Sequence, residues 1–591
     1  MSEPGKHRYE FGPFLLDAGE QTLLRGGEPV PLTPKAFETL VLLVANSGHV
    51  IGKQEFIEKV WPGTFVEPNN LNVNISTLRK ALGTTPDGQE YIETVPRRGY
   101  RFTACVRELP PDETRAPAAR NGAHARHEAI NSLAVLPLIN ASADPTVEYL
   151  SDGITESIIN SLSQLPQLRV MARSTVFRYK GRDVHPQEAG HEMGVRAVLT
   201  GRVFQFSDRL IIRAELTDVA DGWQLWGEQY NSEPSDIFVV QEEISQEISE
   251  KLRLKLSGEE RLRLAKRHTE SADAYQAYLK GRFYWNKRTV ESLKKSVELF
   301  EEAIRLDPNY ALAYAGLADA YLLLGSVEYG ALDPVSAMEK ARQSAAAAFG
   351  RDASLAEAHA SLAYVRIFDW DWAEAEREYQ RAIELNPSYA TAYHWYGLYL
   401  TAMGRPEEGF ANLRRARELD PLSLPINVGV GFYYYLMRRY TEAVAEYRKT
   451  LEMEPNFYMT YFGLGMALTQ DRIFDGAIAA YRKAIELSGG SPLMRAGLGH
   501  AYAAAGRGEE ARAVLGELGR GGGRADQKSI SPYFMAAIHA GLGEQDEAFR
   551  KLREACRTRS EGLFWLKVDP VLDSLRADPR FADILRFVGL A

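Results

Sequence analysis

The sequence predicts a multidomain protein: an α+β domain at the N-terminus, a small α/β domain in the middle and an all-α repeat solenoid at the C-terminus. Three observations predict this order. Three helical stretches and a hairpin follow one another between positions 8 and 107. Strand-like and helix-like stretches then alternate over residues 131–256. From residue 271 onward, a helical pattern returns with a period of about 34 residues.

Composition limits the classes of function. A chain of 591 residues has room for several domains, and its formal net charge of −9 argues against a nucleic-acid coat but not against one local docking face. Cys105 and Cys556 lie too far apart in sequence to indicate a disulfide framework. Because the chain has no apolar signal region and no run of about 18 apolar residues, we expect a cytoplasmic protein with no membrane partner.

The first elements are short. Strand-like pieces broken by glycine and proline fill the sequence before Leu32. Thr33 and Pro34 then suit the N-cap and the first position of a helix, which we expect to end at Gly48. A second helix is predicted over Lys53–Trp61, and the loop Thr64–Pro68 leads to a third.

The functional prediction depends on the third helix, Asn69–Leu82. Leu71, Ile75, Leu78 and Leu82 recur at helical spacing and predict a buried stripe. The other positions carry amides, hydroxyls, one valine and a basic end, where an ordinary surface helix would carry Glu and Lys. Asn suits an adenine edge, a small apolar group suits the thymine methyl, and Lys and Arg neutralise phosphates. Taken alone, this stretch could also be an ordinary polar surface helix. The predicted elements on either side of it favour DNA binding.

A predicted hairpin follows the third helix. Tyr91–Val95 and Tyr100–Cys105 have strand character, and Pro96–Gly99 forms the turn between them. Arg97 and Arg98 at the tip are placed to reach a phosphate or the minor groove. Helix, helix, recognition helix and hairpin is the order of a winged helix-turn-helix, which we place at residues 8–107.

This domain resembles the OmpR/PhoB-type C-terminal DNA-binding domain. The resemblance covers about residues 9–106 and rests on three segments in family order: LTPKAFETLVLLVANSGHVIGKQEFIEKVWPG, NNLNVNISTLRKALG and YIETVPRRGYRF. It implies family DNA-contact positions at Asn69, Val73, Asn74, Ser76, Thr77, Arg79, Thr94 and Tyr100. The residue chemistry adds Asn70, Asn72, Lys80, Arg97 and Arg98.

The recognition helix departs from the family in its charge. Positions that are commonly basic or histidine in the family are here Asn69, Asn74, Ser76 and Thr77. We therefore expect weaker non-specific binding and more reliance on base or shape readout.

The middle of the chain predicts a flexible linker and then a small domain. Residues 108–130 are rich in Pro, Ala, Arg and Glu, as linkers are. Residues 131–256 predict an α/β order, with a strand at 132–138, a helix at 148–165 and a hairpin over 196–218. The segments SLAVLPL, YLSDGITESIINSLSQL, AVLTGRV and LIIRAELTDVADGWQLWGEQY resemble the TolB N-terminal-like module, which implies no established chemistry.

This α/β domain has two candidate roles. No acidic pair follows its first strand, which argues against a phospho-accepting receiver. Arg173, Ser174 and Arg178 follow a strand end, where α/β sheets often bind ligands. A ligand or protein-docking role for them and an ordinary loop role both stay open, and the loop role is favoured.

The C-terminal half repeats with the tetratricopeptide period. Pro387, Pro421 and Pro455 recur at this period of about 34 residues and close the similar lines YQRAIELNP, LRRARELDP and YRKTLEMEP. This resembles TPR repeats over residues 271–520, with further hairpins and a cap over 526–591. The resemblance implies a solenoid whose concave groove holds a peptide or partner helix. The groove positions would be His394, Thr401, Tyr435, Phe462 and Gln470. For Tyr435 and Phe462, a core role is the alternative.

We found no chemical motif that predicts catalysis. The sequence has no Walker A motif, no Gly-x-Ser-x-Gly elbow and no His-Glu-x-x-His pair. We therefore expect no enzyme activity, no catalytic residue, no metal site and no cofactor.

The domains together predict a bacterial, one-component transcription regulator that resembles CadC-like regulators without their membrane span. It would bind double-stranded DNA, and the TPR array would receive a protein partner or signal. A homodimer on two half-sites and a contact of the loop Thr64–Pro68 with RNA polymerase belong to this hypothesis. The alternative is a TPR scaffold or adaptor whose winged helix docks a protein, for example RNA polymerase, rather than DNA.

Overall fold

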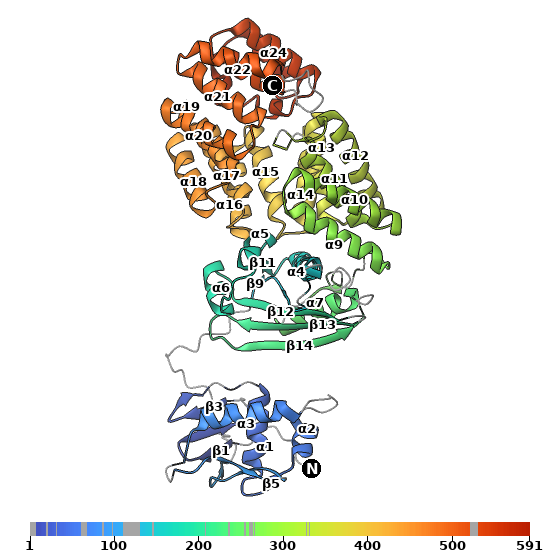
Figure 1. Ribbon diagram of the computed structural model, residues 1–591, viewed down its shortest axis with the longest axis vertical. Coiled ribbons are helices and arrows are strands. Elements are labelled where there is room, and N and C mark those ends of the chain that lie inside the picture. Colours follow the sequence, from blue (N-terminus) through green and yellow to red (C-terminus); the bar gives the residue numbers. More distant parts are fainter. Residues whose placement is uncertain are drawn as a thin grey trace. The chain divides into compact units, whose positions relative to one another are not determined.

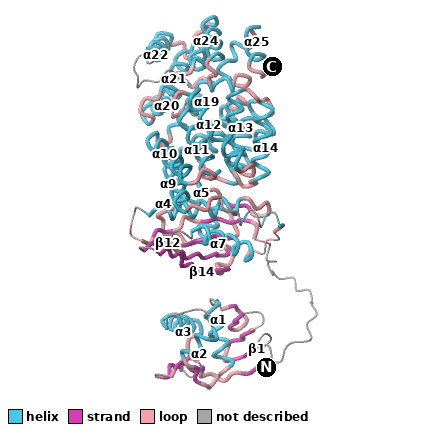
Figure 2. The backbone as a smooth tube through the Cα atoms, turned by 90° about the vertical axis from the view of Figure 1, so that its right-hand side faces the viewer, coloured by secondary structure: helices cyan, strands magenta, loops and turns pink. Residues whose placement is uncertain are grey.

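The computed structural model describes residues 8–591 apart from 19–21, 31, 33, 61–67, 86–87, 97, 110–129, 143, 145–146, 207–208, 234–236, 253, 255, 259, 261–263, 265, 267, 327, 330 and 521–529. The chain divides into two compact units, residues 1–126 and residues 127–591. We describe each unit by itself (Figures 1 and 2).

In its described residues, the N-terminal unit has two sheets and three helices. An antiparallel sheet has the strand order β4-β3-β2-β1-β8, and a smaller one has the order β5-β7-β6. The strands are β1 (Arg8–Phe11), β2 (Phe14–Asp17), β3 (Thr22–Arg25), β4 (Glu28–Pro29), β5 (Val50–Ile51), β6 (Ile92–Val95), β7 (Gly99–Phe102) and β8 (Arg107–Leu109). The helices are α1 (Pro34–Ala45), α2 (Lys53–Val60) and α3 (Pro68–Leu82). This is the predicted winged-helix order.

Strand β8 corrects the predicted start of the linker. We expected residues 108–130 to be flexible, but Arg107–Leu109 pairs with β1, with Glu108 opposite Tyr9. The backbone hydrogen bonds of an edge strand decide this, and composition does not report them. Residues 110–129 of the predicted linker lie outside the described residues.

The second unit begins with an α/β domain. Its sheet has the order β11-β9-β12-β13-β14, with β10 beside β12. β11, β9 and β12 are parallel, whereas β12, β13 and β14 are antiparallel. The elements are β9 (Ser132–Val135), β10 (Ile139–Asn140), α4 (Glu148–Ser163), β11 (Arg169–Val170), α5 (Arg173–Val176), the 3₁₀ turn η2 (Phe177–Tyr179), α6 (Pro186–Met193), β12 (Ala197–Phe206), β13 (Arg209–Asp218), β14 (Gln224–Ser232) and α7 (Ile237–Lys251).

Eight helical hairpins follow within the described residues and form the array. They are α9 (Ala272–Asn286) with α10 (Val290–Leu306), α11 (Ala311–Gly325) with α12 (Pro334–Arg351), α13 (Ala356–Asp369) with α14 (Trp372–Leu385), α15 (Ala390–Ala402) with α16 (Pro406–Leu419), α17 (Leu424–Leu436) with α18 (Tyr440–Met453), α19 (Tyr458–Gln470) with α20 (Phe474–Leu487), α21 (Pro492–Ala504) with α22 (Gly508–Arg520), and α23 (Pro532–Gly541) with α24 (Gln545–Arg557).

The turns inside the hairpins repeat the predicted period. Trp370, Gly404, Arg438, Arg472 and Gly506 follow one another at this period, and each has a left-handed φ between 58° and 85°. A tight turn between antiparallel helices requires this conformation at one position. The periodicity in the sequence therefore reflects a backbone constraint as well as packing.

The last residues, 559–591, return along the array, and we call them the C-terminal tail. The tail comprises the 3₁₀ turns η5 (Glu561–Trp565) and η6 (Pro570–Leu575) and helix α25 (Pro579–Phe587). It packs on the last hairpin and also reaches back to the α13–α14 turn, where Trp372 Nε1 donates to the carbonyl of Val588 at 2.9 Å. The tail therefore joins the end of the array to its third hairpin.

Candidate nucleic-acid interface

The apolar stripe of α3 fixes the orientation of this helix. Leu71, Ile75, Leu78 and Leu82 are each at most 1% exposed and belong to the core of the N-terminal unit. The predicted buried stripe is confirmed. Because helical residues project radially, the polar positions opposite these apolar residues face away from the core.

Three polar side chains form a row on the solvent face of α3. Asn72, Ser76 and Lys80 are exposed, and their spacing of four positions aligns them along the helix. Asn74 and Thr77 beside this row are half-buried. The row offers an amide and a hydroxyl for base edges and a cation for a phosphate. The described side chains do not include those of Asn69, Asn70 and Val73.

Tyr100 lies beneath this row. We expected a wing contact with DNA, but the residue is only 5% exposed and its ring packs against Phe56 at a centroid distance of 6.1 Å. Its hydroxyl donates a hydrogen bond to Oδ1 of Asn72 at 2.8 Å. The structure therefore makes Tyr100 a residue that orients the Asn72 amide, and leaves its ring no free face.

Arg79 connects α3 to the hairpin. Its Nε and Nη2 donate to the carbonyl of Ile92 at 3.0 and 2.8 Å, and Nη2 also donates to Oγ1 of Thr94 at 2.8 Å. Glu90 pairs with the same guanidinium at 2.9 Å. A planar fork of donors suits such a bridge. Arg79 is thus engaged by the hairpin, while Thr94 itself is exposed.

The wing turn is held by a close backbone approach. Gly99 has a φ of 144°, and a Cβ there would lie 1.9 Å from the carbonyl oxygen of Ile51. Only glycine lets β7 pass so close to β5. Arg98 N donates to the carbonyl of Val95 at 3.1 Å, and the Arg98 side chain is exposed. Arg97 and most of the predicted polymerase loop Thr64–Pro68 lie outside the described residues.

Two predicted groove positions in the array are wrong. Thr401 is fully buried and donates to the carbonyl of Gly397, one turn earlier in α15. Tyr435 is also fully buried, and its hydroxyl donates to Oδ1 of Asp569 in the C-terminal tail at 3.0 Å. The tail covers Tyr435, and the spacing of the repeats does not predict that contact.

The other groove positions have different surroundings. His394 is 8% exposed and lines a cavity beside the tail, and burial lowers its pKa to about 4. Phe462 and Gln470 are half-buried, so a partner contact at these two positions stays a prediction.

The residues after β11 attach the α/β domain to the array. Ser174 and Thr175 both donate to the buried carboxylate of Asp420, and burial raises the pKa of that carboxyl. Arg178 Nη2 donates to the carbonyl of Met453 at 2.9 Å, and Arg173 pairs with Glu156. Figure 1 shows α5 next to the array. This segment therefore makes its contacts within the chain, between the α/β domain and the array.

The described residues include no group of three or more His, Cys, Asp or Glu side chains arranged to hold a metal ion. Cys105 is exposed and Cys556 is buried, and both are free thiols. Within the same residues, no helix has both the length and the apolar character that a membrane crossing needs.

Three family models match parts of this chain, one for a transcriptional regulatory domain and two for tetratricopeptide repeats. The family "Transcriptional regulatory protein, C terminal" matches residues 27–102, which include α3 and the wing. Tetratricopeptide repeat families match residues 371–423 and 433–492, and residues 468–523. The predicted TolB N-terminal-like resemblance of the middle domain stays a prediction.

Three of the matching curated relatives show how the similarity is distributed along the chain. The putative adenylate cyclase 3 of Rhizobium meliloti is 36% identical over 187 residues, which is 32% of each chain. The transcriptional regulator HilA of Salmonella typhimurium is 25% identical over 411 residues, or 69% of each chain. The transcriptional activator CadC of Escherichia coli is 34% identical over 96 residues, which are 16% of this chain and 19% of CadC. The chain thus spans about a third of the first relative.

Proposed function

We propose that this chain is a one-component regulator that reads specific DNA sequences. The proposal rests on its transcriptional-regulator domain at residues 27–102 and its tetratricopeptide repeats within residues 371–523. The N-terminal domain is a DNA-binding domain of a transcription regulator, and the C-terminal repeats are a protein-interaction array. A regulator of the chromosome works in the cytoplasm, and we include that location in the proposal.

The observation that carries the proposal is the exposed row of α3 beside the wing. In the proposed complex α3 enters the major groove, where Asn72 and Ser76 contact base edges and Lys80 contacts a phosphate. Arg98 at the wing turn reaches the neighbouring backbone or minor groove. We assign Asn69, Asn70, Val73 and Arg97 to the same interface from their positions in the sequence.

Binding assays at several salt concentrations test this division of roles. Replacing Arg97 and Arg98 with Ala should weaken binding to every DNA sequence and make the slope of log K against log salt shallower by about 1 to 2, since each phosphate contact contributes about 0.9. Asn72→Ala should instead reduce the preference for the specific site. Arg107→Ala, at an exposed position on β8, is the matched control. Equal binding by all these variants would contradict the proposal.

We also propose that the chain has no catalytic activity of its own, since its family matches are to a transcriptional regulatory domain and to tetratricopeptide repeats. Further partners are a second copy of the chain on paired half-sites, with avidity set by the linker, and RNA polymerase. Footprinting on the DNA upstream of the gene, with and without polymerase, distinguishes a DNA-binding regulator from an adaptor that binds protein only. The adaptor would leave no footprint in the absence of polymerase.

A further inference from the structure

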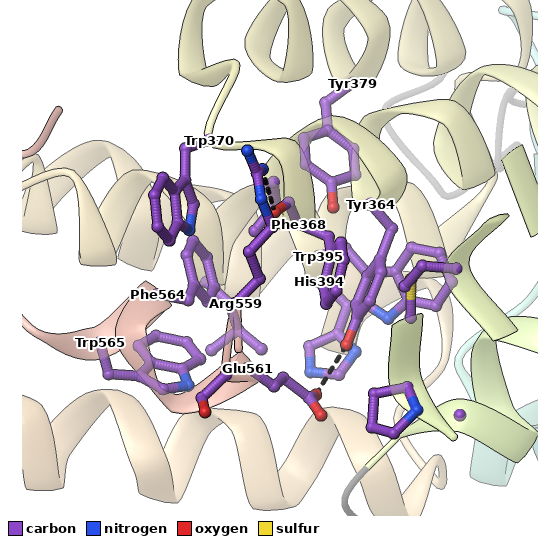
Figure 3. A pocket seen from close by; sticks show the side chains of 16 residues that line it. Tyr364, Phe368, Trp370, Tyr379, His394, Trp395, Arg559, Glu561, Phe564 and Trp565 are labelled. Carbon is purple, nitrogen blue, oxygen red and sulfur yellow. Dashed lines mark hydrogen bonds between the residues drawn. The ribbon is translucent and has the colours of Figure 1, made fainter. Parts of the chain in front are cut away.

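A cavity of about 230 Å³ lies between the array and the C-terminal tail. Tyr364 of α13 and Trp395 of α15 form one wall, and Phe564 and Trp565 of the tail form the other. Figure 3 shows these two groups on opposite sides, with Glu561 extending between them. Since an apolar cavity of about 150 Å³ holds a benzene molecule, this one has room for a two-ring molecule.

Aromatic contacts hold both walls in place. Tyr364 and Trp395 pack at a centroid distance of 5.5 Å, and Phe564 and Trp565 at 4.4 Å. Trp372 stacks on Phe564 at a centroid distance of 6.2 Å. These neighbours restrict the rings to positions that leave space between the walls, and two facing aromatic walls favour a flat guest.

The polar groups of the cavity determine which hydrogen-bonding group such a guest needs at its edge. The carboxylate of Glu561 accepts a hydrogen bond from the Tyr364 hydroxyl at 2.9 Å and is acceptor-only when ionised. Arg559 is directed elsewhere, because it donates to the carbonyl of Phe368 and lies 4.8 Å from the Trp370 ring. The imidazole of His394 is neutral at pH 7, since its pKa is about 4. Among the described lining residues, the cavity therefore presents a carboxyl acceptor and no cation aimed at the guest.

We propose that this cavity binds a small, flat, two-ring aromatic molecule that donates an N–H hydrogen bond to Glu561. The guest would touch the array and the tail at once, and its binding would hold the tail on the array. That this cavity serves as the signal input of the regulator depends on the proposed function. Binding itself is measured without DNA, so the two proposals fail separately.

Calorimetry with the full chain tests the site with two probes of equal shape. Benzimidazole carries the N–H donor, and benzoxazole has an oxygen in that position. We expect saturable one-to-one binding of benzimidazole and at least tenfold weaker binding of benzoxazole. Glu561→Gln should reduce the affinity for benzimidazole about tenfold and leave benzoxazole unchanged. No saturable heat from benzimidazole, or equal affinities for both probes, would overturn the proposal.

A cavity-filling variant locates the binding. Leu398→Trp places a large ring at the cavity and should abolish binding, whereas Ile473→Trp, at an exposed position on the array, should not. Hydrogen exchange on the unmodified chain gives an answer that does not depend on variant folding. Benzimidazole should protect residues 361–370, 394–398 and 559–565, and protection only outside these segments would refute the site.

Discussion

At the scale of single residues, the Tyr100–Asn72 hydrogen bond gives the candidate interface its most specific feature. The donor lies in the wing strand β7 and the acceptor lies on α3, 28 residues earlier. Because the bond fixes one atom of the amide, it selects which group of Asn72 faces outward. In the proposed complex, a buried tyrosine would thus take part in recognition without contacting DNA.

Tyr100→Phe should therefore relax sequence preference without unfolding the domain. The ring stays in the core, and only the hydroxyl is lost. We expect the ratio of specific to non-specific affinity to fall about fivefold to tenfold, within the range of about 1–3 kcal/mol that one base contact provides. Competition binding measures this ratio. Tyr9→Phe, a hydroxyl deletion on β1, should leave it unchanged, and an unchanged ratio in Tyr100→Phe would refute the orienting role.

Arg79→Lys separates a structural role from a phosphate contact. Lys keeps the charge but cannot form the fork to Ile92 and Thr94. We expect a loss of about 1–2 kcal/mol in the free energy of unfolding of the N-terminal unit, because the hydrogen bonds are lost from a partly buried carbonyl. Urea unfolding measures this. Unchanged stability together with weaker DNA binding would assign Arg79 to phosphate contact instead.

The sequence anticipated the residues that follow helical spacing and missed those set by distant contacts. The exposure of Asn72, Ser76 and Lys80 follows from the buried apolar residues on the other side of α3. The burial of Tyr100 does not follow from any local pattern, because alternation along β7 fits either face. Its partners, Phe56 and Asn72, come from two other elements.

At the scale of elements, the hydrogen bonds of Asp569 hold the tail on the array. Its carboxylate accepts from Tyr435 of α17 at 3.0 Å and from Tyr533 of α23 at 2.8 Å. Burial raises the pKa of this carboxyl above its ordinary value of 3.8. One acidic side chain thus ties η6 to two separate hairpins.

Asp569 predicts a specific pH dependence. Between pH 3.8 and the raised pKa, the native protein binds more protons than the unfolded chain, so the contribution of Asp569 to the free energy of unfolding falls as pH rises. Asp569→Asn lacks this group. The stability advantage of the unmodified protein over the variant should therefore be greatest near pH 4 and shrink toward pH 7. Urea unfolding across this range tests it, and an advantage that grows with pH would show that the ionised form is the stabilised one.

The helices of the array were predictable, as was a cap at its end, whereas the contacts of the tail with the array were not. The tetratricopeptide period fixes each hairpin and its turn, as the left-handed residues from Trp370 to Gly506 illustrate. The segment Gly562-Leu-Phe-Trp-Leu566 departs from that period and is strongly apolar, which is the local sign of a special role. Which repeats it contacts depends on the curvature of the whole solenoid, and this explains the wrong assignment of Tyr435.

At the scale of the whole molecule, the chain consists of two units with separate cores. Separate cores should melt separately, so scanning calorimetry should resolve two transitions. DNA that carries the specific site should raise only the transition of the N-terminal unit, and benzimidazole only that of the larger unit, because a ligand stabilises the unit that binds it. Each unit should show its transition alone after cleavage within residues 110–129. A single transition that both ligands shift would contradict this independence.

The return of the tail has a consequence for biosynthesis. Most solenoids can fold repeat by repeat as they leave the ribosome, since each repeat contacts only its neighbours. Here the hydrogen-bond partner of Trp372 is Val588, which is translated 216 residues later. The nascent array must therefore remain open on that side until the tail has been made, and a chain terminated before the tail would expose the aromatic residues that the missing segment was to cover.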